Sequence, residues 1–221
     1  MVSELSHAPV SEPSETRRRI MEAALETIRA VGITGVSARA IAATGGFNQA
    51  LIFYHFGSVN NLLVQAARVT TSARVATYRE ITSDVESLTS LVDIARRLHA
   101  ESQSDGSVAV LTQLMAGAAF NPEMGSSVRE GFEEWIDVVE SALRSALEGE
   151  PIASVVPTRE AAYSIAALFL GIELIARLDP SRSEAETVFD GLHDLAALLE
   201  SIPPAISRFI KTPARERAPR P

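Results

Sequence analysis

The stretch VSARAIAATGGFNQALIFYHFGSVNNLLVQA, residues 36–66, is the most informative part of the chain for the fold. Its apolar residues recur at helical spacing in two short segments, which Gly45-Gly46 separates. Ser37 can cap a helix over 38–44, and Asn48 can cap the next helix, over 49–54. The two glycines can adopt the positive φ that a tight turn between helices needs. We therefore expect a helix, a turn and a second helix.

The second of these short helices begins with side chains that suit a DNA groove. Asn48 and Gln49 lead into Ala50, and an aromatic group follows at 53–56. Amide side chains can pair with adenine edges, arginine can pair with guanine, and Tyr, Ser or His can donate to phosphates. A helix of this size fits a major groove. On spacing alone, an ordinary amphipathic helix pair with a few polar surface residues explains the pattern equally well.

Helical periodicity continues through the rest of the chain, and no stretch alternates polar and β-branched residues between turn signals. The predicted fold class is therefore all-α, with about nine helices and a loop at 104–107. The predicted helices cover residues 16–31, 38–44, 49–54, 59–82, 85–103, 108–120, 158–178 and 184–202, and a further one follows Asn121-Pro122 and carries Val128 to Leu147.

The charge is distributed unevenly along the 221 residues. The net charge is −8, yet residues 17–79 carry eight arginines against two glutamates, and the remainder is strongly acidic. A uniformly acidic protein would be repelled by phosphate. A basic module joined to an acidic body instead favours contact with nucleic acid.

Several classes of protein are disfavoured by the composition. The chain has no cysteine, which excludes disulfides, thiolate metal sites and a thiol nucleophile. Its four histidines are scattered and no catalytic motif is present, so we expect no catalytic residue, no metal and no cofactor, and hence not an enzyme. The longest apolar run, 165–175, contains Glu173 and is too short for a membrane span. Without a leader pattern at the N-terminus, we expect a cytoplasmic protein with no membrane contact.

Within the stretch, Ala42, Gly46, Tyr54-His55-Phe56 and Leu62 resemble the N-terminal signature of the tetracycline-repressor family. The resemblance covers about residues 16–66. It implies dimeric repressors with a three-helix DNA-binding head and a ligand-binding body. The DNA contacts that the resemblance carries over are Ser37, Arg39, Asn48, Gln49, Ala50, Phe53, Tyr54 and His55. Among these, Arg39 and Gln49 are the expected base readers, and Tyr54 and His55 position the DNA backbone.

Two positions depart from the family pattern. Val59 stands where many members have lysine, and Leu51 stands where a small hydroxyl residue is common. The lysine position contacts phosphate in the family, so the departure weakens that contact here. Ser58 and the amides of the following helix start can offer a phosphate the positive end of a helix dipole instead.

Four segments follow from these patterns. We expect an N-terminal arm over 1–15, a helix-turn-helix head over 16–57, a ligand-binding and dimerisation body over 58–203, and a C-terminal tail over 204–221. The helix over 158–178 is apolar on more than one face, which predicts a partner surface besides the core. The expected dimer interface comprises Ile165, Leu168, Ile172, Ile175, Leu192, Leu195 and Leu199. An internal bundle without a partner is the alternative.

The middle helices combine large apolar residues with small ones, which can leave a cavity for a small-molecule effector. The candidate pocket residues are Leu111, Thr112, Met115, Phe132, Trp135 and Phe169. The same residues can instead form ordinary core. If the pocket exists, its ligand is mostly apolar. Thr112, Gln113 and His99 are possible polar anchors, and a surface position is an equal expectation for His99.

These patterns together predict a ligand-responsive transcriptional regulator that binds double-stranded DNA as a homodimer. We expect a repressor that a mostly apolar small molecule releases from a palindromic operator. Two alternatives remain: a helical ligand carrier or enzyme that retains a vestigial DNA-binding head, and a helical protein-interaction module.

Overall fold

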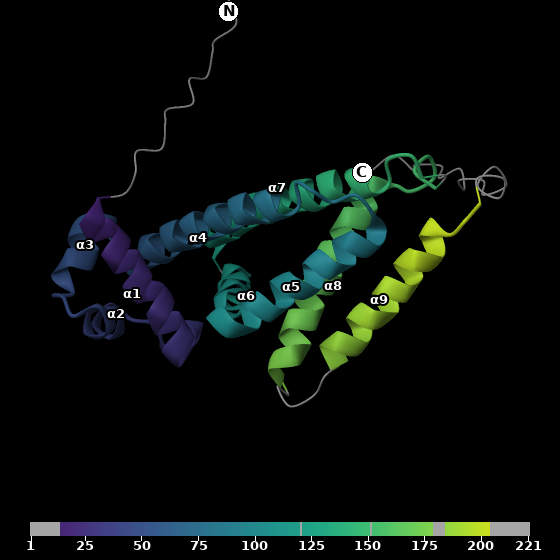
Figure 1. Ribbon diagram of the computed structural model, residues 1–221. Coiled ribbons are helices and arrows are strands. Elements are labelled where there is room, and N and C mark those ends of the chain that lie inside the picture. The colour runs from purple at the N-terminus through teal and green to yellow at the C-terminus, as the bar shows by residue number, and fades with distance from the viewer. Residues whose placement is uncertain (1–13, 120, 151, 179–183, 204–221) are drawn as a thin grey trace, which may run out of the picture. The chain divides into compact units, whose positions relative to one another are not determined.

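The computed structural model describes residues 14–203 apart from 120, 151 and 179–183 (Figure 1). Every regular element in these residues is helical, with nine α-helices and one short 3-10 helix. The all-α prediction is therefore confirmed. Most of the predicted N-terminal arm and the predicted tail from 204 onward lie outside the described residues. In the described part, no helix has the length and hydropathy that a membrane crossing requires.

The chain forms two compact units, one up to Ala67 and one from Arg68 onward. The division falls inside α4, which runs from Val59 to Ile81. The first unit contains α1 (Glu15–Val31), η1 (Ile33–Gly35), α2 (Ala38–Gly45), α3 (Ala50–Phe56) and the start of α4. Each unit has its own buried side chains, and each is described separately below.

Local capping chemistry sets the helix boundaries of the first unit. The Ser37 hydroxyl accepts a hydrogen bond from the Ala40 amide at 3.2 Å, so Ser37 is the N-cap of α2 as expected. Gly32, with φ of 74°, follows the last residue of α1. The core of this unit is aliphatic and aromatic, and its buried members include Ile20, Ala24, Ile28, Ile41, Ile52, Phe56, Leu62 and Ala66.

The two glycines of the turn have different roles. Gly46 adopts the left-handed conformation, with φ of 65°, as predicted. Gly45 is instead the last residue of α2, so the prediction of a positive φ there is wrong. A Cβ at Gly45 would lie 2.1 Å from Phe47 Cε1 and 2.9 Å from Ala23 Cβ. Glycine is needed at this position because other groups approach it closely.

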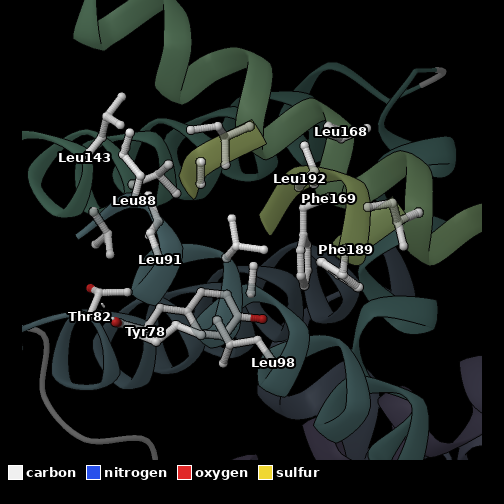
Figure 2. Close-up of a pocket in the computed structure, with 18 of the residues that line it drawn as sticks. Tyr78, Thr82, Leu88, Leu91, Leu98, Leu143, Leu168, Phe169, Phe189 and Leu192 are labelled. Atoms are coloured by element: carbon white, nitrogen blue, oxygen red, sulfur yellow. Dashed lines mark hydrogen bonds between the residues drawn. The ribbon is translucent and has the colours of Figure 1, made fainter. Parts of the chain in front are cut away.

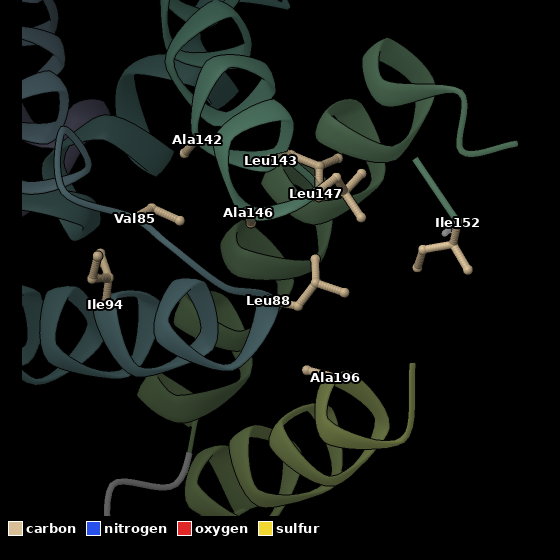
Figure 3. Packing of buried hydrophobic residues seen from close by; sticks show 9 residues of the cluster. All are labelled: Val85, Leu88, Ile94, Ala142, Leu143, Ala146, Leu147, Ile152 and Ala196. Carbon is tan, nitrogen blue, oxygen red and sulfur yellow. The ribbon is translucent and has the colours of Figure 1, made fainter. Parts of the chain in front are cut away.

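The second unit contains the rest of α4 and five further helices. These are α5 (Leu88–Asp105), α6 (Ser107–Ala118), α7 (Pro122–Ala146), α8 (Thr158–Leu178) and α9 (Glu184–Glu200). Helix α5 packs along α9, and α7 packs along α8 (Figure 1). Buried side chains from α5, α7, α9 and the intervening loops form one apolar cluster (Figure 3). Its buried members are Val85, Leu88, Ile94, Ala142, Leu143, Ala146, Leu147, Ile152 and Ala196.

The predicted loop at 104–107 is wrong. Helix α5 continues to Asp105 and α6 begins at Ser107, with only Gly106 between them. Gly106 has φ of 65°, a left-handed conformation that redirects the chain within one residue. A loop of several residues is therefore not required. The break at Asn121-Pro122 is confirmed, because the Asn121 side chain accepts from the Met124 amide at 3.2 Å and Pro122 is the first residue of α7.

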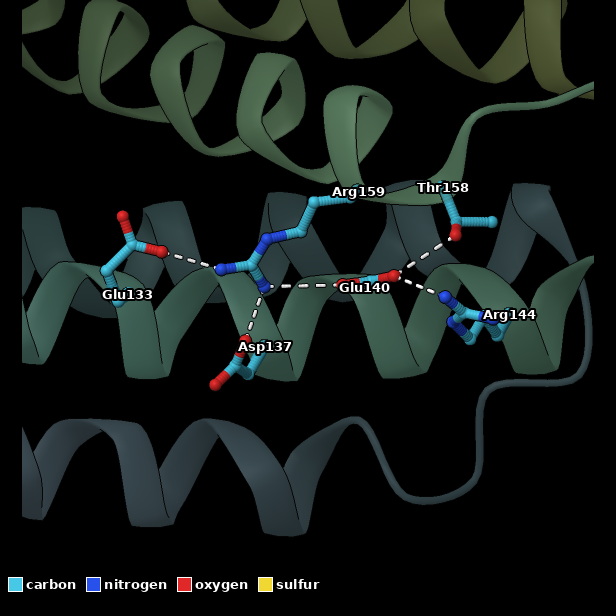
Figure 4. Close-up of polar contacts among 6 residues, drawn as sticks. All are labelled: Glu133, Asp137, Glu140, Arg144, Thr158 and Arg159. Atoms are coloured by element: carbon cyan, nitrogen blue, oxygen red, sulfur yellow. Dashed lines mark hydrogen bonds and ion pairs between the residues drawn. The ribbon is translucent and has the colours of Figure 1, made fainter.

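A network of ion pairs joins the start of α8 to α7 (Figure 4). Arg159 contacts three carboxylates on successive turns of α7: Glu133 at 2.6 Å, Asp137, and Glu140 at 3.3 Å. The hydrogen bond from Arg144 lowers the pKa of Glu140, and those from Arg159 and Thr158 act in the same direction. The network joins the two helices at the protein surface, where solvent screens each ion pair.

Candidate functional site

Helix α3 presents a two-sided surface in the first unit. Ile52 and Phe56 are buried against the core, whereas Phe53 and Tyr54 are 50% and 82% exposed. Gln49, directly before the helix, is also exposed. The exposed side of α3 and of the residue that precedes it is therefore available to a partner.

Most of the other predicted DNA contacts are exposed as well. Arg39 lies on the exposed side of α2, and the side chains of Asn48 and Ala50 are exposed at the start of α3. The Asn48 Oδ1 accepts from the Ala50 amide at 2.9 Å, which orders the chain as it enters α3. His55 is half-buried, and its ring meets the Tyr54 ring edge to face with centroids 4.9 Å apart.

Arg17 is a structural residue of this unit that the sequence did not single out. Its guanidinium donates to the backbone carbonyl of His55 and to the Gln65 side chain, and it lies 4.5 Å from the centre of the Phe56 ring. The contacts span α1, α3 and α4, so Arg17 fixes the C-terminal end of α3 against both helices. No local sequence signal marks such a role, because the partners lie 38 and 48 residues away along the chain.

The N-terminus of α4 is capped by the side chain of Ser58, the residue directly before the helix. The Ser58 hydroxyl accepts from the Asn61 amide at 3.0 Å. This contact uses one of the amides that were expected to face phosphate. Val59 and Leu51, the two departures from the family pattern, are both half-buried.

The second unit contains two neighbouring apolar cavities. The larger has a volume of about 200 Å³ and is lined by α4, α5, α7, α8 and α9 (Figure 2). Aliphatic side chains dominate its wall, among them Leu91 and Leu98, and Phe189 also lines it. Among the described lining residues, Tyr78 and Thr82 have hydroxyl side chains, and both already have contacts. The Thr82 hydroxyl donates to the Tyr78 carbonyl at 2.8 Å, and Arg74 donates to the Tyr78 hydroxyl at 3.2 Å.

The second cavity is smaller, about 30 Å³, and lies among α4, α6, α7 and α8. Five of the six predicted pocket residues line it: Leu111, Met115, Phe132, Trp135 and Phe169. Trp135 and Phe169 also line the larger cavity. Thr112 lines neither of the two, and its hydroxyl donates to the Ala109 carbonyl at 2.9 Å. The larger cavity, with its wall from α5 and α9, was not anticipated from the sequence.

The residues predicted for the dimer interface lie at different depths. Leu168, Ile175 and Leu195 are 44%, 55% and 51% exposed, whereas Ile172 is buried within the protomer. Ile165 and Leu199 pack against the apolar cluster of Figure 3, and Leu192 is half-buried on the wall of the larger cavity. The exposed apolar surface of these two helices also includes Leu174 and Leu198, which the sequence analysis did not name.

A buried polar cluster joins α5 to α8. Glu173 is completely buried, and its carboxylate contacts His99 Nδ1 at 2.7 Å, the Ser102 hydroxyl at 2.6 Å and the Gln103 amide at 3.1 Å. His99, one of the possible polar anchors, is thus buried, and its Nδ1 is in contact with Glu173. Its ring packs against Phe189 with centroids 5.5 Å apart. In the described residues, no group of three or more metal-ligating side chains is arranged to hold a metal ion.

Comparison with known proteins agrees with this architecture. Residues 20–66 match the family model described as bacterial regulatory proteins, tetR family. No curated protein matches the chain. The segment that matches is the same one in which the exposed side of α3 and its buried partners lie.

Solved structures show the same fold over most of the chain. The fatty acid degradation regulator FadR from Bacillus halodurans is 15% identical, with a TM-score of 0.69 over 84% of this chain and 96% of that chain. FadR from Bacillus subtilis in complex with stearoyl-CoA is 16% identical, with a TM-score of 0.68 over 83% and 97%. A TetR transcription regulator from Haloarcula marismortui is 16% identical, with a TM-score of 0.67 over 85% and 97%. The resemblance found in the sequence is therefore confirmed: residues 20–66 match the model of the tetR family of bacterial regulatory proteins, and the chain has the fold of solved TetR-family regulators.

Proposed function

We propose that the protein is a ligand-responsive transcriptional regulator that binds double-stranded DNA as a homodimer and represses transcription. The observation that carries this proposal is the exposed side of α3 within the segment that matches the tetR family. Gln49 and Arg39 read base edges in the major groove, because amide and guanidinium groups can each make two hydrogen bonds to one base. Tyr54 and His55 contact the DNA backbone and set the register of the helix in the groove.

The dimer forms through the exposed apolar residues of α8 and α9, of which Leu168, Ile175 and Leu195 are the predicted ones. A two-fold dimer presents two copies of α3, so its operator is a near-palindrome with half-sites about 34 Å apart, one turn of the double helix. Helix α4 runs through both units of each protomer, which makes it the natural connection between ligand and DNA.

The effector is a mostly apolar small molecule that occupies the cavities of the second unit. The walls of the larger cavity support this proposal, since they offer few polar groups. The solved FadR from Bacillus subtilis, which has the same fold, was determined with stearoyl-CoA, a molecule with a long apolar chain. Ligand binding favours a conformation of the body in which the two heads do not fit successive grooves, with a coupling free energy of about 1–3 kcal/mol.

A gel-shift experiment with the gene's own upstream region tests the function. We expect the purified full chain to retard this DNA at low salt, to release it as salt rises, and to prefer it over random duplex of the same length. The salt dependence follows from the release of counterions from the phosphates. A protein that shows no preference for its upstream region in dilute buffer would contradict the proposal, and turnover of a substrate by the DNA-free protein would favour an enzyme instead.

A further inference from the structure

The two cavities of the second unit share one wall. Tyr78, Trp135 and Phe169 line both of them. Their rings contact one another, with centroids 6.3 Å apart for Tyr78 and Trp135 and 5.9 Å for Trp135 and Phe169. The cavities are therefore neighbouring chambers with an aromatic partition between them. These side chains would have to change rotamer for one molecule to occupy both chambers.

The two chambers differ in polarity. Among the described residues that line the larger one, none has a charged side chain. The smaller one is lined by Arg74 together with Thr70 and Thr71, and Arg74 is the one charged residue among the described residues that line either chamber. Arg74 donates to the Tyr78 hydroxyl and lies 5.8 Å from the centre of the Tyr78 ring, so its guanidinium is adjacent to the partition. The chambers form an apolar compartment with a cation and two hydroxyls at one end.

We propose that this compartment binds an amphiphile with a carboxylate head and an apolar chain, with the head beside Arg74 and the chain in the larger chamber. This inference rests on the proposed function and names the chemical class of its effector. Arginine binds a carboxylate through charge-assisted hydrogen bonds, which are about twice as strong as neutral ones. An ammonium head cannot accept hydrogen bonds from the guanidinium, and an uncharged head would gain less from it.

The sizes of the chambers agree with this orientation. A cavity of about 150 Å³ is known to hold a benzene molecule, and a single water needs roughly 10–15 Å³. The larger chamber, at about 200 Å³, accordingly has room for a chain of moderate length, and the smaller one, at about 30 Å³, has room for a group as small as a carboxylate. A phosphate head is larger than a carboxylate and would have less room in the smaller chamber.

Isothermal titration calorimetry of the full chain with decanoate, decanol, decylamine and decyl phosphate tests the head group. We expect decanoate to bind about tenfold more tightly than each of the other three, which corresponds to about 1.4 kcal/mol. In Arg74→Gln, decanoate should lose about tenfold in affinity while decanol changes little, and Arg74→Lys should keep part of the preference because it keeps the charge. Arg79→Gln is the matched control, since Arg79 is exposed on the same helix and lines neither chamber.

A separate test addresses the placement of the ligand's apolar chain in the larger chamber. Leu91→Trp narrows the larger chamber and should weaken decanoate much more than hexanoate. Thermal melting of each variant establishes that it is folded before binding is measured. Equal affinities for decanoate and decylamine in the wild-type chain, or an unchanged preference for decanoate in Arg74→Gln, would overturn the inference.

A gel-shift on the same preparations separates the two proposals. Specific DNA binding without a preference for decanoate overturns only the effector class. A clear preference for decanoate without specific DNA binding overturns the proposed function and leaves the ligand site standing.

Discussion

Single residues of α3 and its surroundings divide sharply between structure and recognition. Ile52 is fully buried and Tyr54 is 82% exposed, although only two positions separate them in the sequence. Arg17 and Arg39 differ in the same way. The first holds α3 in place through the His55 carbonyl and the Phe56 ring, whereas the second is exposed on α2. Residue type alone does not tell which arginine packs against the core and which is exposed to a partner, because both have the same charge and donors.

Substitutions on this surface should separate base reading from backbone contact. Gln49→Ala and Arg39→Ala should each weaken binding to the operator by about 1–3 kcal/mol and leave binding to random DNA nearly unchanged. Tyr54→Phe should weaken binding to all sequences alike, because a phosphate contact carries no sequence information. Fluorescence anisotropy with specific and random duplexes measures both effects.

Arg29→Ala is the control for the loss of one positive charge, since Arg29 is exposed at the end of α1 and is paired with Glu26. It should behave like the wild type on both duplexes. Equal losses on specific and random DNA for Arg39→Ala would remove Arg39 from the base readers.

At the scale of helices, the contact between α5 and α8 depends on a polar cluster inside an apolar unit. The Glu173 carboxylate is completely buried and satisfies donors from three residues of α5. Burial of a carboxylate is costly unless hydrogen bonds and an opposite charge compensate it. The cluster therefore specifies one register of α8 on α5, because a shift of either helix would leave the carboxylate without its partners.

Removal of the Glu173 carboxylate should destabilise the protein strongly. Glu173→Ala removes the carboxylate partner of the buried His99 and Ser102 side chains, and we expect a loss of about 3 kcal/mol in the free energy of unfolding. Glu173→Gln keeps the shape and one acceptor oxygen, so it should cost less. Glu160→Ala, an exposed change on the same helix, should stay within about 0.5 kcal/mol of the wild type. Urea unfolding measures all three, and similar midpoints for Glu173→Ala and Glu160→Ala would refute the role of the cluster.

For the whole molecule, the exposed apolar side chains of α8 and α9 are the surface on which the proposed dimer depends. Leu174, Ile175, Leu195 and Leu198 are each at least half exposed. Such side chains gain free energy when a partner covers them, about 25 cal/mol for each Å² of apolar surface removed from water. A two-fold arrangement brings the same surface of both protomers together.

Charged substitutions on this surface should therefore separate the protomers. Ile175→Arg combined with Leu198→Arg should halve the mass seen by analytical ultracentrifugation and weaken binding to the full palindrome about a hundredfold, because the two half-sites are no longer bound by one linked molecule. Neither residue lines a cavity. Val69→Arg, at a comparably exposed apolar position on α4, should leave the mass unchanged. A double variant that keeps the dimeric mass would place the interface elsewhere.

Local sequence patterns determined the helical fold class, most helix boundaries and the N-terminal family segment. Caps such as Ser37, turns such as Gly46 and the apolar spacing of each helix act within a few residues, so they are readable without tertiary contacts. The prediction of a loop was wrong at Gly106, because its left-handed conformation connects α5 to α6 through a single residue.

Only the tertiary structure decided which side chains meet across long separations in the chain. Arg17 meets Gln65 across 48 residues, and Glu173 meets His99 across 74 residues. The partition between the two cavities combines Tyr78, Trp135 and Phe169 from three helices. The physical reason is that helical periodicity determines which face of a helix is apolar, whereas the packing of helices against one another determines which residues of that face fill the core and which line a cavity.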